Sequence, residues 1–160
     1  MQLSKNFSLA EMTKSVTAKR LGIDNTPNEQ QIEYLRELCT NVLQPLRDEL
    51  GPILITSGLR VPELNKAVGG SGTSQHCALN GAAADIDMDA KNTEVFNYIK
   101  DNLEFDQLIA EGSNGKGDLL WVHVGYRKEE NRNQILIAVF KNGKATYLPY
   151  TEKLYKEIYG

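Results

Sequence analysis

The order of two hydrophobic periodicities constrains the fold of this chain more than any other feature. Residues 27–50 carry apolar side chains mostly at steps of three and four residues, which predicts an amphipathic helix. Residues 82–149 contain several short segments that are apolar or alternate apolar with polar positions, as strands do. Because helical segments come first and strands concentrate later, the sequence predicts an α+β fold. A chain of 160 residues is long enough to bury a core, and we expect a single domain over 1–160.

Local signals divide the chain into further elements. Ser8 has a glutamate three residues later, a capping-box spacing that predicts a short helix. Thr26 before Pro27 is the expected cap of the long helix, which Pro45 is expected to bend. The other expected elements are strands at 51–58, 82–90, 105–111 and 119–126, helices at 61–68, 91–103 and 151–160, a turn at 113–118, and a hairpin at 134–149 that turns near Asn142-Gly143.

Composition excludes several classes of protein. The net charge of −3 argues against binding to nucleic acid, which needs a basic surface. No apolar run approaches the ~20 residues of a membrane helix. Residues 1–15 lack the apolar core of a signal peptide, so we expect synthesis in the cytoplasm and, for an outside substrate, release or export by another system. Cys39 and Cys77 form no disulfide framework; Cys39 is expected to be buried in the long helix.

Both histidines of the chain are candidate metal ligands. His76 lies in TSQHCALNGAAADID, nine residues before Asp85, and His123 lies in LLWVHVGYR. Catalytic zinc takes three protein ligands from His, Asp, Glu or Cys and leaves a position open. Strand alternation puts His123 on the face opposite Val122 and Val124, as expected between a cleft and a core. The alternative is two hydrogen-bonded structural imidazoles and a solvated carboxylate.

Residues 7–132 resemble the zinc D-Ala-D-Ala carboxypeptidase family, and in particular its small phage-associated branch, which includes endolysins. The segments that carry the resemblance are ITSGLRVPELNKAVGG, SQH, GAAADIDM, FDQLIAEG and WVHVGYR. The resemblance implies a fold of the hedgehog and D-Ala-D-Ala-peptidase type, with N-terminal helices packed on a mainly antiparallel sheet. It also implies a Zn²⁺ cofactor with His76, Asp85 and His123 as its ligands.

One departure from the family pattern affects His76. The family usually has two residues between the first histidine and the glycine, whereas four stand between His76 and Gly81 here. Two extra loop residues cost little entropy, but metal ligands tolerate small displacements only. Either the loop bulges away from the site, or His76 misses the metal and Cys77 is the nearest substitute.

The general base is also displaced from its common family position. Many relatives place a carboxylate three residues before the last histidine, where this chain has Leu120. A zinc peptidase needs a carboxylate to move protons. The phage-associated members share the QLI-x-E stretch, which favours Glu111. Asp118 is the other nearby acid, and its glycine-rich surroundings are typical of a turn. A structural role for Glu111 is the alternative.

The resemblance implies a substrate-binding role for two further residues. Arg60, in the S-G-x-R stretch, would bind substrate or stabilise the developing oxyanion, because a guanidinium matches a carboxylate or a polarised carbonyl. Ser74 matches a family serine near the substrate. Asp87 is expected either to support a ligand histidine or to be solvated, and Gln107 is a candidate for a hydrogen bond in the cleft.

The resemblance implies zinc-dependent hydrolysis of peptide bonds in peptidoglycan stem peptides. The chain would act as a D-Ala-D-Ala carboxypeptidase or as an endolysin-type endopeptidase, with a wall peptide as its partner. A second hypothesis is a cell-wall-binding or phage structural module that keeps the fold without turnover. A third is a metal-independent hydrolase with Cys77 as its nucleophile.

Overall fold

The computed structural model of the chain describes residues 1–112 and 118–159 and confirms the α+β class. Most of the predicted turn at 113–118 lies outside the described residues. The helices are α1 (Leu9–Thr13), α2 (Val16–Leu21), α3 (Glu29–Leu38), the π-helix η1 (Cys39–Leu43), α4 (Gln44–Leu50), α5 (Pro62–Ala67), the 3₁₀ helices η2 (Gln75–Cys77) and η3 (Asp89–Lys91), α6 (Asn92–Asn102) and α7 (Glu152–Tyr159). The strands are β1 (Ile55–Ser57), β2 (Ala82–Ile86), β3 (Gln107–Glu111), β4 (Trp121–Tyr126), β5 (Gln134–Lys141) and β6 (Lys144–Pro149).

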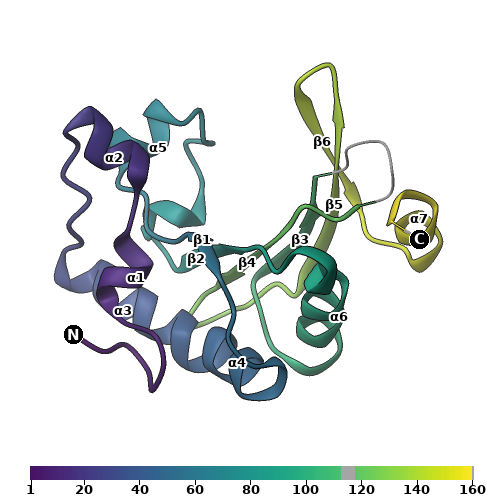
Figure 1. Cartoon of the computed structure of the whole chain (residues 1–160), viewed down its shortest axis with the longest axis horizontal. Helices are drawn as coiled ribbons and strands as arrows, with labels where there is room; N and C mark the ends of the chain where they lie inside the picture. The colour runs from purple at the N-terminus through teal and green to yellow at the C-terminus, as the bar shows by residue number, and fades with distance from the viewer. Residues whose placement is uncertain (113–117, 160) are drawn as a thin grey trace.

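The strands form one mainly antiparallel sheet, as predicted. Their order is β1-β2-β4-β3-β5-β6, and among these neighbours only β3 and β5 run parallel. In Figure 1 the β5–β6 hairpin reaches beyond the body of the sheet, while α6 lies beneath it. Asn142 and Gly143 both have positive φ, 51° and 76°, which is the backbone of the two-residue turn predicted for this hairpin.

Alternation along the central strands gives the sheet two different faces. Leu108 and Ala110 of β3 and Val122 and Val124 of β4 are fully buried on one face. Helices α3, α4 and α6 cover that face and complete the hydrophobic core (Figure 1). The intervening residues of the same strands, His123 among them, point to the opposite face, where the chain forms a cleft. The sheet therefore separates the core from the candidate site.

The long N-terminal helix is confirmed, with a local change of geometry near Pro45. Helix α3 continues into the five-residue π-helix η1 and then into α4, which has proline in its first turn. Proline has no backbone N–H to donate to the preceding turn, and a wider π turn is one way for a helix to accommodate this. Cys39, at the start of η1, is fully buried, as predicted.

The start of this helix was predicted at the wrong residue. Asn28, not Thr26, is the N-cap: its side chain accepts from the backbone N–H of Gln31 at 2.8 Å. The Gln31 side chain in turn accepts from the backbone N–H of Asn28 at 2.8 Å, which completes a capping box. Pro27 consequently precedes the cap. At the first helix, Ser8 accepts from the Glu11 N–H at 3.1 Å and caps α1 as expected.

The strand predicted at 82–90 ends early. β2 stops at Ile86, so Asp87 and Asp89 do not extend a polar strand face. Asp87 Oδ1 instead accepts from the backbone N–H of Asp89 and from Asn92 Nδ2, each at 3.0 Å. These bonds order the start of α6, and Asp87 does not support a histidine.

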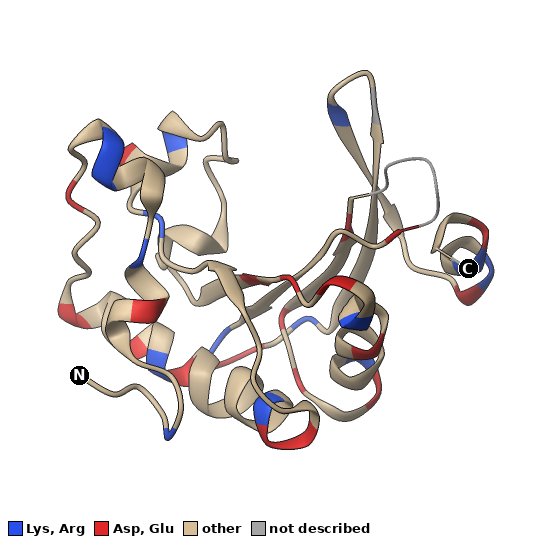
Figure 2. Cartoon of the chain, in the orientation of Figure 1, with Lys and Arg blue, Asp and Glu red and all other residues tan. Residues whose placement is uncertain are grey.

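The helices carry both basic and acidic residues. Figure 2 shows Lys and Arg interspersed with Asp and Glu along the N-terminal helices, α6 and α7. Across residues 1–112 and 118–159, no helix combines the length and apolar character that crossing a membrane requires.

The position of the cap can be tested by two alanine substitutions. We expect Asn28→Ala to lower the free energy of unfolding by about 1 kcal/mol, because it leaves N-terminal N–H groups of α3 unsatisfied. Thr26→Ala should change it by less than about 0.5 kcal/mol. Urea unfolding monitored by circular dichroism measures both. A larger loss in Thr26→Ala would return the cap to Thr26.

Candidate metal centre

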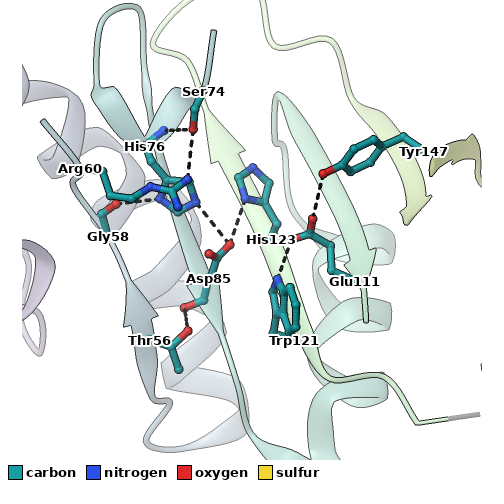
Figure 3. A network of polar contacts seen from close by, with 10 residues as sticks. All are labelled: Thr56, Gly58, Arg60, Ser74, His76, Asp85, Glu111, Trp121, His123 and Tyr147. Carbon is teal, nitrogen blue, oxygen red and sulfur yellow. Dashed lines mark hydrogen bonds and ion pairs between the residues drawn. The ribbon is translucent and has the colours of Figure 1, made fainter. Parts of the chain in front are cut away.

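Three segments that are far apart in the sequence bring His76, Asp85 and His123 together (Figure 3). Antiparallel pairing of β2 with β4 places Asp85 opposite His123, and His123 Nδ1 lies 3.0 Å from Asp85 Oδ1. Helix η2 carries His76, whose Nε2 lies 3.3 Å from the same oxygen. One possible ligand atom from each residue lies within 4.8 Å of the others. The sequence-predicted ligand set is therefore assembled in space.

Backbone contacts fix the orientation of His76. Its Nδ1 lies 2.7 Å from the Gly58 carbonyl oxygen, which can only accept, so Nδ1 carries the proton and Nε2 has the free lone pair. The His76 carbonyl accepts from the Arg60 backbone N–H at 2.7 Å. The side chain is 2% exposed. His76 is thus held from both its ring and its backbone, with Nε2 facing Asp85.

The longer loop after His76 does not separate this residue from Asp85. Leu79 is 63% exposed and Asn80 is also exposed, whereas His76 stays buried beside Asp85. Ala78, with left-handed backbone at φ of 53°, ends η2. His76 thus reaches the cluster with Asp85 and His123, and Asn80 of the loop lines the same cleft.

Cys77 is not positioned to replace His76 or to act as a nucleophile. Its side chain is 2% exposed and is not among the described residues that line the cleft. Burial raises the pKa of its thiol, which disfavours the thiolate needed for either role. Gln31 Nε2 donates to its carbonyl at 3.2 Å, so the residue anchors the loop to α3.

The electrostatics of the cluster suit a cation. Burial alone would raise the pKa of Asp85, but the two neighbouring imidazoles lower that pKa well below its usual range. Burial lowers the pKa of His76, whereas for His123 the hydrogen bond and charge of Asp85 outweigh burial and raise the pKa. Two imidazoles and an ionised carboxylate are a common donor set of catalytic zinc sites. The residues present therefore fit the expected metal.

Glu111 lies in the same cleft, which has a volume of about 870 Å³. It pairs in register with Trp121 across β3 and β4, and Trp121 Nε1–H donates to its Oε2 at 2.6 Å. The Tyr147 hydroxyl lies 3.5 Å from Oε1 (Figure 3). Glu111 is 9% exposed, and its burial raises the pKa of its carboxyl. Asp118, the other predicted candidate, is not among the described residues that line the cleft.

Arg60 and Ser74 lie beside His76, on the opposite side of the cluster from Glu111 (Figure 3). Arg60 Nη2 donates to Ser74 Oγ at 3.4 Å, and Ser74 Oγ accepts from the His76 backbone N–H at 3.2 Å. Arg60 Nε is buried without a hydrogen-bond partner, and no described carboxylate forms an ion pair with this guanidinium. Its positive charge is available at the cleft, which it lines.

A hydrogen-bonded brace next to His76, formed by Gln75, Asp106 and Arg132, was not predicted from the sequence. Asp106 is fully buried and accepts from Arg132 Nε at 3.0 Å, from Arg132 Nη2 at 2.8 Å and from Gln75 Nε2 at 2.7 Å. Gln75 is the neighbour of His76 in η2, and its side chain crosses β4 at Gly125. A Cβ on Gly125 would lie 2.0 Å from Gln75 Oε1. The absence of a side chain at Gly125 is what allows the brace to form.

Gln107, also named from the sequence, lines the cleft and donates from Nε2 to Gln134 Oε1 at 2.8 Å. Tyr147 is a second site residue that sequence patterns did not indicate. It lies on the predicted hairpin, and only the order of the strands brings it to Glu111.

The brace predicts an effect of Gly125 on metal binding. We expect Gly125→Ala to push Gln75 off Asp106, loosen η2 and weaken zinc binding by about tenfold. Competition with a chromophoric chelator measures the affinity. Gly72→Ala is the matched control, since a Cβ there meets nothing within 4 Å. Equal zinc affinity in Gly125→Ala and the wild type would show that the brace does not hold His76.

Comparison with known proteins agrees with this geometry. No curated protein matches the chain in a sequence search. The sequence profile described as Peptidase M15 matches residues 5–125, which include every candidate metal ligand and Glu111. The match confirms the resemblance to zinc D-Ala-D-Ala carboxypeptidases, and the chain belongs to the peptidase M15 family.

Proposed function

We propose that this protein is a zinc-dependent peptidase that cuts peptide bonds in peptidoglycan stem peptides. The observation that carries the proposal is the convergence of His76, Asp85 and His123 at a cleft that also contains the buried carboxylate of Glu111. A metal ligand set and a separate carboxylate are the two parts that metal-assisted peptide hydrolysis requires. Membership in the peptidase M15 family supports the same class of reaction.

His76 Nε2, Asp85 Oδ1 and a ring nitrogen of His123 would hold the metal. Zinc held by these residues would supply Lewis-acid chemistry, namely polarisation of a carbonyl and a lower pKa for water. Glu111 takes a proton from the attacking water and returns it to the leaving amine. A raised pKa suits both transfers, because the carboxyl must accept and then release a proton near neutral pH. The bond from Trp121 to Oε2 fixes the orientation of the carboxylate during these steps.

Arg60 and Ser74 would bind the substrate on the other side of the scissile bond. The Arg60 guanidinium has an unpartnered Nε and no acidic partner among the described residues, so it can pair with a substrate carboxylate or a developing oxyanion. Ser74 would hold that guanidinium in place through its hydroxyl. A peptide that ends in a carboxylate, as a D-Ala-D-Ala terminus does, matches this cation. If the chain instead cuts an internal peptide bond, as an endopeptidase does, the Arg60 guanidinium would stabilise the oxyanion.

Two structural observations favour turnover over a purely binding or structural module. That alternative was motivated by the longer His76 loop and by Leu120 at the common position of the acid. His76 lies in the ligand cluster despite its longer loop, and Glu111 of β3 supplies a carboxylate in the cleft. Action on the cell wall, after release from the cytoplasm by another system, is part of the proposal.

The metal requirement gives one test. After zinc exposure and buffer exchange, we expect about one zinc per chain in the wild type, because the three donors form one site. His76→Ala and His123→Ala should each lose the metal and all release of peptides from purified peptidoglycan. Elemental analysis and mass spectrometry of the digests give the two readouts. Wild-type cleavage that persists after chelation would reject the metallopeptidase.

The proposed role of Glu111 as general base gives a second test. Glu111→Gln removes the proton acceptor but keeps the size of the side chain, so we expect kcat to fall by a factor of about 10²–10⁴ with zinc content unchanged. Asp118→Asn is the matched control and should keep kcat within about twofold. The reverse result, with loss in Asp118→Asn alone, would assign the role of general base to Asp118.

A further inference from the structure

The β5–β6 hairpin contributes a wall of the cleft although it lies beyond residues 5–125, the segment that matches the peptidase family. Its cleft-lining residues are Gln134, Leu136, Phe140 and Tyr147. In Figure 1 the hairpin stands out from the sheet on the side of β3 away from β2. Asp85 and His123 therefore lie on the same sheet as this wall, on the strands β2 and β4.

Strand register explains which hairpin side chains reach the cleft. β5 runs parallel to β3, with Leu136 opposite Ile109, so the even-numbered residues of β5 share the face of Ile109. Ala138 pairs with Tyr147 of β6, which puts Tyr147 on that face as well. Ile137 points the other way and is fully buried in the core.

The side chains next to Glu111 are aromatic. The rings of Trp121 and Phe140 lie 6.1 Å apart between centroids, and both Trp121 and Tyr147 contact the Glu111 carboxylate. Phe140 is 37% exposed and Tyr147 is 51% exposed. The wall thus presents uncovered apolar surface within the cleft, where a ligand can cover it.

The end of the cleft farther from Glu111 is lined by polar side chains. Gln107 lies opposite Gly125 and Gln134, and its amide donates to Gln134 Oε1 at 2.8 Å. Arg132, bound to Asp106 just before β3, also lines this end. A peptide that crosses the metal centre along the strand direction therefore meets an aromatic surface on one side and a polar surface on the other.

We propose that the aromatic wall of Trp121, Phe140 and Tyr147 determines specificity by binding an apolar side chain of the substrate residue next to the scissile bond. The proposal rests on the peptidase function proposed above and names the residue type that the cleft prefers there. Burial of that side chain against exposed aromatic rings provides the binding energy.

Tyr147 has a second task as a positioning residue. Its hydroxyl contacts Glu111 Oε1 at 3.5 Å, while Trp121 Nε1–H binds Oε2. The two contacts hold the carboxylate from both oxygens between the wall and His123 (Figure 3). The hairpin thereby links recognition of the substrate side chain to the orientation of the base.

The substrate specificity of the zinc-loaded full chain tests whether the aromatic wall binds an apolar side chain. The probes are synthetic stem peptides that carry glycine, alanine or leucine on either side of the bond that the wild type cuts. We expect kcat/KM at one of these positions to favour alanine or leucine over glycine by about tenfold, and Phe140→Ala to lose that preference. Thr146→Ala, an exposed change on the opposite face of the hairpin, should keep it.

Two results would contradict the proposal that the aromatic wall determines specificity. One is a wild type with no preference among glycine, alanine and leucine at either position, and the other is a Phe140→Ala variant that keeps the full preference. Either result would leave the peptidase function intact, because cleavage itself would persist. If the wild type releases no peptide from these probes or from purified peptidoglycan, the peptidase function fails and the wall with it.

Tyr147→Phe separates the two tasks of Tyr147, since it keeps the ring and removes the hydroxyl. We expect the side-chain preference to remain, KM to stay within about twofold, and kcat to fall by about tenfold. An unchanged kcat would contradict the positioning role. Circular dichroism and zinc content should match the wild type in every hairpin variant.

Discussion

The pairing of β2 with β4 is the constraint on which the candidate active site depends. Its antiparallel register sets Asp85 directly opposite His123, and the same register buries Ala84 and Val124 together on the core face. A slip by one residue would turn the ligands toward the helices and the apolar residues toward the cleft, so hydrophobic burial strongly specifies this register. The core thus fixes two ligands at no separate cost, and only His76 needs additional support from its loop.

That support comes from hydrogen bonds on several sides of η2. The Gly58 carbonyl binds the ring of His76, the Arg60 N–H binds its backbone, and Gln75 ties the helix to the buried carboxylate of Asp106. Because Gly58, Arg60 and Gln75 all precede the longer loop in the sequence, the additional loop residues leave the imidazole in place. A site on rigid strands with one braced loop holds its ligands more accurately than a site built from loops alone.

Much of this arrangement follows from local sequence patterns, and the remainder depends on contacts that only the fold creates. Periodicity predicted the long helix and the strands, and the resemblance to a known family indicated all three candidate ligands. The cap of α3 was misplaced because Thr26 and Asn28 are both good caps and their sequence does not rank them. Asp106 and Tyr147 were missed because their partners lie 31 and 36 residues away, where the order of the strands decides the contact.

X-ray absorption at the zinc edge of the loaded protein tests the central claim most directly, because it reports the atoms bound to the metal. The account predicts two imidazoles and oxygen donors at roughly 2.0–2.2 Å, with no sulfur. Two imidazoles in the wild-type spectrum, together with loss of the bound zinc in both His76→Ala and His123→Ala, would establish the predicted centre. A sulfur neighbour at about 2.3 Å would instead place Cys77 on the metal, and the absence of imidazole scattering would contradict the site altogether.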